Sequence, residues 1–492
     1  MVNNIPDNIV APLLAFDIES GGQFSSELNE ILIGFGNADG ALAAGGISIC
    51  STVNEARRLA GRGSMLESMF IRARKNAPAQ VIYVGRVADI GTAEIRTLTV
   101  GAVPASGGQG VVLIAGESVS IDIAAGTSSA DTATALAAAI NSYFNALTKK
   151  SLPFTATVAN AVVTLTARHK GVYASKLDIF TPVLEGGNVF TATNLTMATT
   201  TPGAGNPDLS TILAAMGDDP FEAMVVPFND NANLVLLDDF LTARWGYDQQ
   251  LYGHAVYPFT GTDTEINLKG LARDTWHLTL FPIIAGGGNG TPDYEAVAGA
   301  FSRTLPMLGS GSDGRVSANQ SGLVVSGVTA PRDRNFWPDY PTRNAWLQNG
   351  VSAWKVDRSG DVIIDKLITQ QQTTNGVPDT ALRDIQAVYQ LTYALKFIRA
   401  QLAYEHSNKA IADDNPSNLP SIVTVRDIKS TLVHACIDLS RRGVLEFDND
   451  IAGQITVVRN LDNPNRVDIV LPMDRVNPLD IFAGLARVYA QI

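Results

Sequence analysis

Residues 377–402 read VPDTALRDIQAVYQLTYALKFIRAQL. Apolar side chains recur here at every third or fourth position, from Leu382 through Tyr389 to Leu402, and this spacing predicts one long amphipathic helix. We expect the helix to begin at Val377-Pro378-Asp379, because proline suits an early helical position and aspartate is favourable beside the N-terminal dipole. The rest of a C-terminal module, from about residue 362 to the end, is organised around this helix.

A second helix and several strand-like segments complete this module. The helix is expected over 424–442, with Ile428, Leu432 and Leu439 on one face and Gly443 at its end. Residues 455–459 (ITVVR) and 466–471 (RVDIVL) alternate like strands, and a third extended run covers 479–489. Chain ends normally fray unless they are tied down. The apolar terminal run therefore either docks in its own sheet or pairs with the sheet edge of a partner.

The composition limits the class of protein. A chain of 492 residues is too long for one core, so about three or four domains are expected. Net charge is −12 and basic clusters are few, which argues against nucleic-acid binding. Cys50 and Cys436 lie in apolar patterns and fit a reducing compartment without disulfides. We expect neither a signal peptide nor a membrane span, because no apolar run approaches the about 18 residues that a bilayer requires.

The N-terminal part predicts an arm followed by an α/β unit. Residues 1–22 contain two prolines and a short extended run, and they are either a frayed end or an arm. Buried strands are expected at 31–34, 47–49 and 81–85. Helices are expected after Thr52 and Ser64, each of which has a glutamate three residues on.

The α/β pattern is interrupted at 91–205, where Thr-, Val- and Gly-rich strands around one helix predict an inserted β-rich domain. It resumes with strands at 223–227, 254–257 and 277–281, and with a helix at 295–305 that has Thr291 as its cap and Pro292 at its first position. The predicted fold class is therefore α/β and α+β multidomain, with a helical and β C-terminal module.

No arrangement of residues points to catalysis. The histidines do not form a zinc motif, and His434 and Cys436 diverge on a helix. Phosphate-binding loops and nucleophile elbows are missing from the sequence. Paired aspartates such as Asp218-Asp219 are typical of solvated turns. We therefore predict no catalytic residues, no metal and no cofactor, and the pair Arg441-Arg442 is read either as a complement to the helix dipole or as a docking contact.

Several motifs, in order along the chain, resemble those of contractile bacteriophage tail sheath proteins, especially of the Mu-like branch. Residues 5–12 (IPDNIVAP) are similar to the N-terminal arm of that family. Residues 61–78 contain GRGSML and ARKNAP, which resemble "FGxGSxLxxM…ARxxNP". Residues 162–171 (VVTLTARHKG) resemble a Mu-like segment. WLQNGVS at 346–352 and residues 357–369 are similar to "LLxxGIsxxxvd..G.vxixRxIT", with Lys366 where arginine is commoner.

The resemblance implies a structural subunit that polymerises with itself as hexameric rings around a tail tube and contracts to drive the tube through the host envelope. It also implies baseplate and tail terminator proteins as partners, assembly in the host cytoplasm and a final place in the virion. The implied division is 1–22 as an N-terminal arm, 23–90 with 206–345 as the α/β sheath body, 91–205 as an outer insertion, 346–476 as an inner module that faces the tube, and 477–492 as a C-terminal strand arm.

The resemblance also implies that both chain ends add strands to sheets of neighbouring subunits. The residues expected to take part in this strand exchange are Ile9, Leu13, Phe16, Val467, Ile469, Leu471, Ile481 and Val488. Arg441 and Arg442 are the candidates for contact with the tube. Three alternatives remain: the sheath of a phage-derived bacteriocin or another contractile injection system, an α/β enzyme with a β-insertion, and a tube or fibre subunit.

Overall fold

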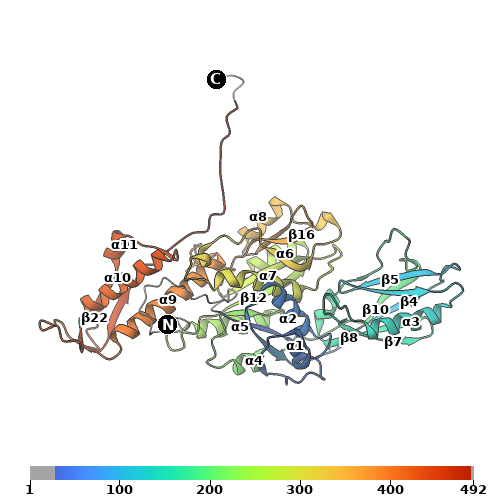
Figure 1. The fold of residues 1–492 in the computed structure, drawn as a ribbon, viewed down its shortest axis with the longest axis horizontal. Helices are drawn as coiled ribbons and strands as arrows, with labels where there is room; N and C mark the ends of the chain where they lie inside the picture. Colours follow the sequence, from blue (N-terminus) through green and yellow to red (C-terminus); the bar gives the residue numbers. More distant parts are fainter. Residues whose placement is uncertain (1–27, 489–492) are drawn as a thin grey trace, which may run out of the picture.

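The computed structural model describes residues 28–488, arranged as an elongated molecule with a central α/β body (Figure 1). The body is built on a six-stranded sheet in the order β13-β12-β11-β1-β3-β2, parallel except for β2. Its strands are β1 (Asn29–Phe35), β2 (Ile47–Ile49), β3 (Val81–Val87), β11 (Ala223–Val225), β12 (His254–Gly261) and β13 (Leu278–Ile284). Its helices are α1 (Val53–Ala60), α2 (Met65–Asn76), α4 (Ser210–Ala215), α5 (Asn231–Arg244), α6 (Asp263–Leu271) and α7 (Asp293–Leu308).

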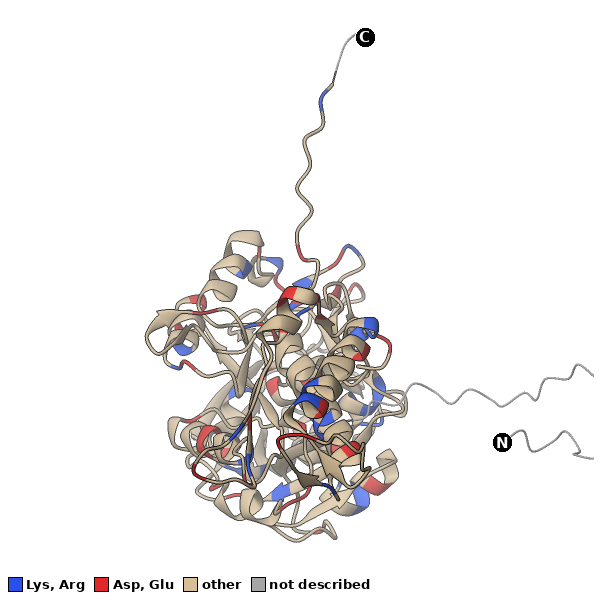
Figure 2. Ribbon diagram, turned by 90° about the vertical axis from the view of Figure 1, so that its left-hand side faces the viewer, with Lys and Arg blue, Asp and Glu red and all other residues tan. Residues whose placement is uncertain are grey.

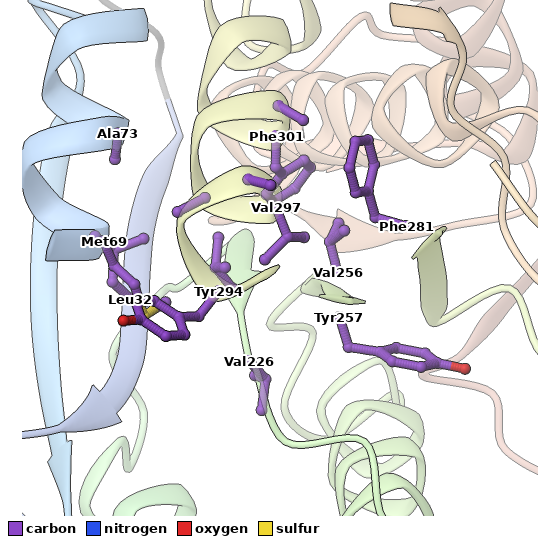
Figure 3. Packing of buried hydrophobic residues seen from close by; sticks show 14 of the residues in the cluster. Leu32, Met69, Ala73, Val226, Val256, Tyr257, Phe281, Tyr294, Val297 and Phe301 are labelled. Atoms are coloured by element: carbon purple, nitrogen blue, oxygen red, sulfur yellow. The ribbon is translucent and has the colours of Figure 1, made fainter. Parts of the chain in front are cut away.

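The core of the body lies where α2 and α7 pack side by side against the sheet. Figure 3 shows Tyr294 next to Met69, and Val297 and Phe301 next to Phe281, and all five side chains are buried. Parallel strands covered by helices bury both of their faces, so these strands are almost continuously apolar. This rigid layer fixes the positions of the segments attached to it.

The expected helix starts in the first part of the body are confirmed. Thr52 accepts a hydrogen bond from the backbone of Glu55, and Ser64 accepts one from the backbone of Glu67. The expectation for the helix after residue 291 was wrong by one position, because its N-cap is Pro292 rather than Thr291.

Residues 93–201 form two antiparallel sheets at one end of the molecule. A four-stranded sheet has the order β10-β4-β8-β7, and a three-stranded sheet has the order β6-β5-β9, with one helix packed against strands of both. Chain entry and exit meet at a bridge between Thr92 and Ala204. The elements are β4 (Ala93–Val100), β5 (Gly108–Ile114), β6 (Glu117–Ile123), α3 (Ser129–Ser142), β7 (Phe154–Ala159), β8 (Val162–Lys170), β9 (Ile179–Phe180) and β10 (Leu195–Thr201).

A second small sheet joins the body to the C-terminal part, which lies at the opposite end (Figure 1). The joining elements are β14 (Val324–Thr329), α8 (Tyr340–Gln348), β15 (Ala353–Val356) and β16 (Asp361–Lys366). The C-terminal elements are β17 (Thr373–Thr374), β18 (Val377–Pro378), α9 (Ile385–His406), β19 (Ala410–Ile411), β20 (Ile422–Val423), α10 (Val425–Arg441), β21 (Leu445–Glu446), α11 (Asn449–Gln454), β22 (Thr456–Arg459), β23 (Val467–Val470) and β24 (Asp474–Arg475).

One expectation for this part was wrong. The long helix α9 begins at Ile385, and Val377-Pro378 instead forms a short strand paired with Thr373-Thr374 across a turn at Asn375-Gly376. Both turn residues have positive φ, as this type of hairpin turn requires. The extended run expected from residue 479 on joins no sheet of this chain as far as residue 488, so docking in its own sheet, one of its two expected outcomes, is not seen among the described residues.

Candidate assembly surface

Strands β22 and β23 form a two-stranded hairpin whose edge is open. The register pairs Thr456 with Val470 and Arg459 with Val467. The amide of Asn460 donates to the carbonyl of Arg466 at 2.9 Å. In an antiparallel pair, hydrogen-bonded and non-hydrogen-bonded residue pairs alternate, so Asp468 and Val470 bond to β22 as Arg466 does. The backbone groups of Val467, Ile469 and Leu471 therefore point away from β22. They are free to pair with another strand.

The side chains of this edge are partly apolar and partly exposed. Val467 and Leu471 pack against the core, while Ile469 remains 39% exposed. A hairpin of two strands is marginally stable on its own, and a third strand adds both backbone hydrogen bonds and buried apolar area. The three residues expected from the sequence are thus brought together on one strand.

The turn of the hairpin is held by an exposed aspartate. Asn460 donates to Asp468 through Nδ2 at 2.6 Å, and Arg466 donates through Nε, also at 2.6 Å. These hydrogen bonds hold the pKa of Asp468 below its usual range. The carboxylate therefore stays ionised and keeps the turn closed at neutral pH.

The last described residues form an extension that leaves the body (Figures 1 and 2). We call residues 481–488, IFAGLARV, the C-terminal extension; their one charged side chain is Arg487. Phe482 is 87% exposed, Leu485 81% and Val488 94%. An apolar segment that is exposed to this degree is characteristic of a surface that becomes buried in a complex.

The structure separates the other expected residues. Ile481 and Val488 lie on the extension, away from the hairpin, and neither packs into a sheet. The expected arm residues Ile9, Leu13 and Phe16 lie outside the described residues. Sequence reasoning missed the polar residues that hold the start of the extension, because they come from segments more than 100 positions apart and no motif connects them.

The two arginines at the end of α10 differ in their surroundings. Arg441 is exposed and pairs with Asp438 at 3.2 Å. Arg442 donates to the hydroxyl of Tyr393 at 2.6 Å and lies over the ring of Phe397, 4.6 Å from its centroid. Arg442 therefore links α10 to α9, and Arg441 has the more accessible charge.

Two searches of residues 28–488 gave negative results. No cluster of three histidine, cysteine or acidic side chains is placed to hold a metal ion in this part of the chain. Among the same residues, no helix has the length and apolarity to cross a membrane.

Comparison with known proteins shows what the chain is similar to. Residues 202–370 match the phage tail sheath protein central domain. The chain is also 25% identical, over 98% of its own length and of the relative's, to a Mu-like prophage tail sheath protein of Haemophilus influenzae. The chain is therefore similar to a phage tail sheath protein over nearly its whole length, and its residues 202–370 match the central domain of that family.

Two crystal structures of sheath tail proteins also match this chain. The protein of Desulfitobacterium hafniense has a TM-score of 0.49 and 13% identity, over 95% of this chain and 97% of the other. The protein of Listeria innocua has a TM-score of 0.49 and 15% identity, over 93% of each chain.

Proposed function

We propose that this sheath subunit polymerises with itself into stacked hexameric rings around a tail tube made by a separate protein, and that contraction of the polymer drives the tube through the host envelope. One observation carries the proposal: a single molecule has both an unpaired strand edge at β23 and an exposed apolar extension. The extension runs away from its own hairpin, so a neighbour is the partner that it can reach (Figure 1).

In this assembly the chain ends exchange strands. The C-terminal extension, with Ile481 and Val488, and the N-terminal arm, with Ile9, Leu13 and Phe16, add to sheets of adjacent copies. The receiving edge is β23, through Val467, Ile469 and Leu471. Added strands bind mainly through backbone hydrogen bonds, and alternate side chains supply specificity.

We assign each segment of the chain a separate role in the assembly. The arms are 1–22 and 477–492, and the α/β body is 23–90 with 206–345. The insertion 91–205 faces outward, and the module 346–476 faces the tube, with Arg441 and Arg442 as the contact candidates. The separation of the insertion and the C-terminal part at opposite ends of the molecule supports this arrangement (Figure 1).

The mechanism is mechanical and has no catalytic step or cofactor. Arms bound to neighbours keep the subunits connected, while the rigid bodies rotate and slide past each other. The extended polymer is then a kinetically trapped state, and triggering at the baseplate releases it to a more compact one. A terminator protein ends the polymer, and assembly takes place in the host cytoplasm before the sheath becomes part of the virion.

Deletion of residues 477–492 tests the proposal. We expect a folded monomer, because residues 477–488 lie largely at the surface, and we expect no tubes. Circular dichroism and gel filtration measure folding, and negative-stain microscopy detects the hollow striated cylinders that the full-length chain should form. Normal cylinders from the truncated protein would exclude this role for the C-terminal arm.

A further inference from the structure

The C-terminal extension does not leave the body as a free tether. Five side chains meet where it starts, and we call them the root network: Asn319, Lys366, Asp384, Arg475 and Asp480. They come from the loop after α7, the end of β16, the N-cap of α9, strand β24 and the chain just before the extension. The network therefore joins the body and the C-terminal module to the root of the extension.

The contacts of the root network fix two consecutive residues. Asn319 donates through Nδ2 to the carbonyl of Leu479 at 2.7 Å and to the carboxylate of Asp480 at 2.9 Å. Lys366 forms an ion pair with Asp480 and a second one with Asp384 at 2.9 Å. Beyond Asp480 the extension proceeds with its apolar side chains in solvent.

Polar contacts, rather than apolar packing, hold this root. The side chain of Leu479 is 60% exposed, so it contributes little apolar packing to the root of the extension. A groove of about 700 Å³, lined by Tyr340, Arg343 and Ile481 among others, lies beside the network and admits solvent. Ion pairs that water can reach are weak one by one and are screened by salt. We therefore expect the ion pairs of the root network to weaken as ionic strength rises.

We propose that Asn319 and Lys366 are positioning residues for polymerisation, which set the direction in which the extension leaves the subunit without themselves contacting a neighbour. This inference rests on the proposed strand exchange. When the root is fixed, Leu479 and Asp480 are already ordered before the extension docks. Without the network, Leu479 and Asp480 are mobile in the free subunit and become ordered only when the extension docks. The entropy that they lose at that step weakens association.

The substitutions Lys366→Met and Asp480→Asn test the inference. Methionine keeps the apolar stem of Lys366 and removes the charge, and asparagine keeps the shape of Asp480. Lys366→Arg should retain function because it keeps a cation. Lys355→Met is the matched control, because Lys355 lines the same groove and pairs with Asp365 at 2.6 Å without contacting the extension.

The first measurement uses dilute monomer and does not depend on polymerisation. A spin label on Leu485→Cys reports the motion of the extension, and the two native cysteines are buried. We expect greater label mobility in Lys366→Met and Asp480→Asn, and in the otherwise unsubstituted labelled protein when salt is raised from about 0.01 M to about 1 M. Unchanged mobility in both variants would overturn the inference.

The second measurement is the threshold concentration for tube formation. We expect it to rise about tenfold in Lys366→Met and Asp480→Asn, since about two additional residues must be ordered at docking, and to stay the same in Lys355→Met. Mobile extensions with an unchanged threshold would refute the positioning role. If the wild-type chain forms no tubes, the proposed function fails, while label mobility still decides whether the root is held.

Discussion

Two edge strands, β7 and β23, lie at opposite ends of the molecule and differ in whether a side chain covers their outward backbone groups. At β7, in the insertion, the outward backbone of Ala156 is occupied by Asn141 of α3, which donates to its carbonyl at 2.7 Å and accepts from its amide at 2.8 Å. At β23 the outward groups of Val467 and Ile469 have no such cover. Both strands are short, antiparallel and regular in register.

The contrast indicates which edge is meant to receive a strand. An unpaired edge is a template for any extended chain, so proteins block edges that have no partner. A side-chain amide that bonds both groups of one residue imitates a strand at that point. The β7 edge of the insertion is thus blocked at Ala156, while the β23 edge of the C-terminal hairpin is left available for assembly.

The largest expected effect comes from a proline on each edge. In Ile469→Pro the lost N–H is one that points outward, so the monomer should fold, while a carbonyl of an incoming strand loses its N–H donor. We expect the threshold for tube formation, measured by sedimentation, to rise by about 100-fold or more. Val158→Pro, on the outward side of β7, is the control and should polymerise normally. Equal behaviour of the two variants would remove the distinction between the edges.

The two ends also differ in their ion pairs with the body. The C-terminal extension is held by ion pairs that water can reach, whereas the insertion contributes a buried one. Lys150 of the insertion is buried and pairs with Glu295 of α7 at 2.9 Å and with Glu117 at 3.5 Å. Lys150→Met removes a buried cation shared by two carboxylates, although Glu295 keeps its ion pair with Arg72 and Glu117 keeps its hydrogen bonds. We expect the free energy of unfolding to fall by about 3 kcal/mol, measured in denaturant. Lys170→Met, at an exposed position of β8, should change it little. A loss below about 1 kcal/mol for Lys150→Met would show that the pairing is unimportant.

Removal of the block on β7 should have a smaller effect. Asn141→Ala loses the two hydrogen bonds to Ala156 and should cost about 1 kcal/mol of stability. It should also allow self-association at high protein concentration, which light scattering would detect. Ser142→Ala removes only a bond within α3 and serves as the control. A variant that loses stability without associating would show that Asn141 acts on stability alone.

The smallest expected effect is on how stability depends on pH, through the carboxylate of Glu117. Burial would raise the pKa of Glu117, but Lys150 and hydrogen bonds from Asn145, Tyr143 and Thr148 lower it overall. A carboxylate with a lowered pKa contributes stability that is present above its unfolded value and is lost as the pH falls through its folded value. Unfolding midpoints between about pH 3 and pH 7 should therefore decrease less steeply with acid in Glu117→Gln than in the wild type. Parallel curves would contradict this assignment.

Much of the local structure could be predicted from the sequence, because short-range signals decide it. The caps at Thr52 and Ser64 and the stop at Gly443 are all present. The start of α9 was placed too early because Pro378 was read as a helical position. The Asn375-Gly376 pair, a strong hairpin signal, was overlooked.

The assembly surface was only partly accessible from the sequence. Alternation identified Val467 and Ile469 as strand residues, but their outward orientation depends on the pairing register. The contacts of Asn319 and Lys366 with Asp480 depend on the tertiary fold, which brings together segments that no local pattern links. Long-range polar contacts of this kind leave no periodic trace in a single sequence.

The bridge between Thr92 and Ala204 has a further consequence. Each residue's amide donates to the other's carbonyl, at 2.8 and 3.1 Å, and Gly91 fits closely against Ala204 because it lacks a Cβ atom. Everything between them therefore leaves and re-enters the body through one narrow neck. A grafted domain could therefore enter and leave at the same neck, provided that it replaces the contacts of Lys150 with Glu295 and of His169 with Met65.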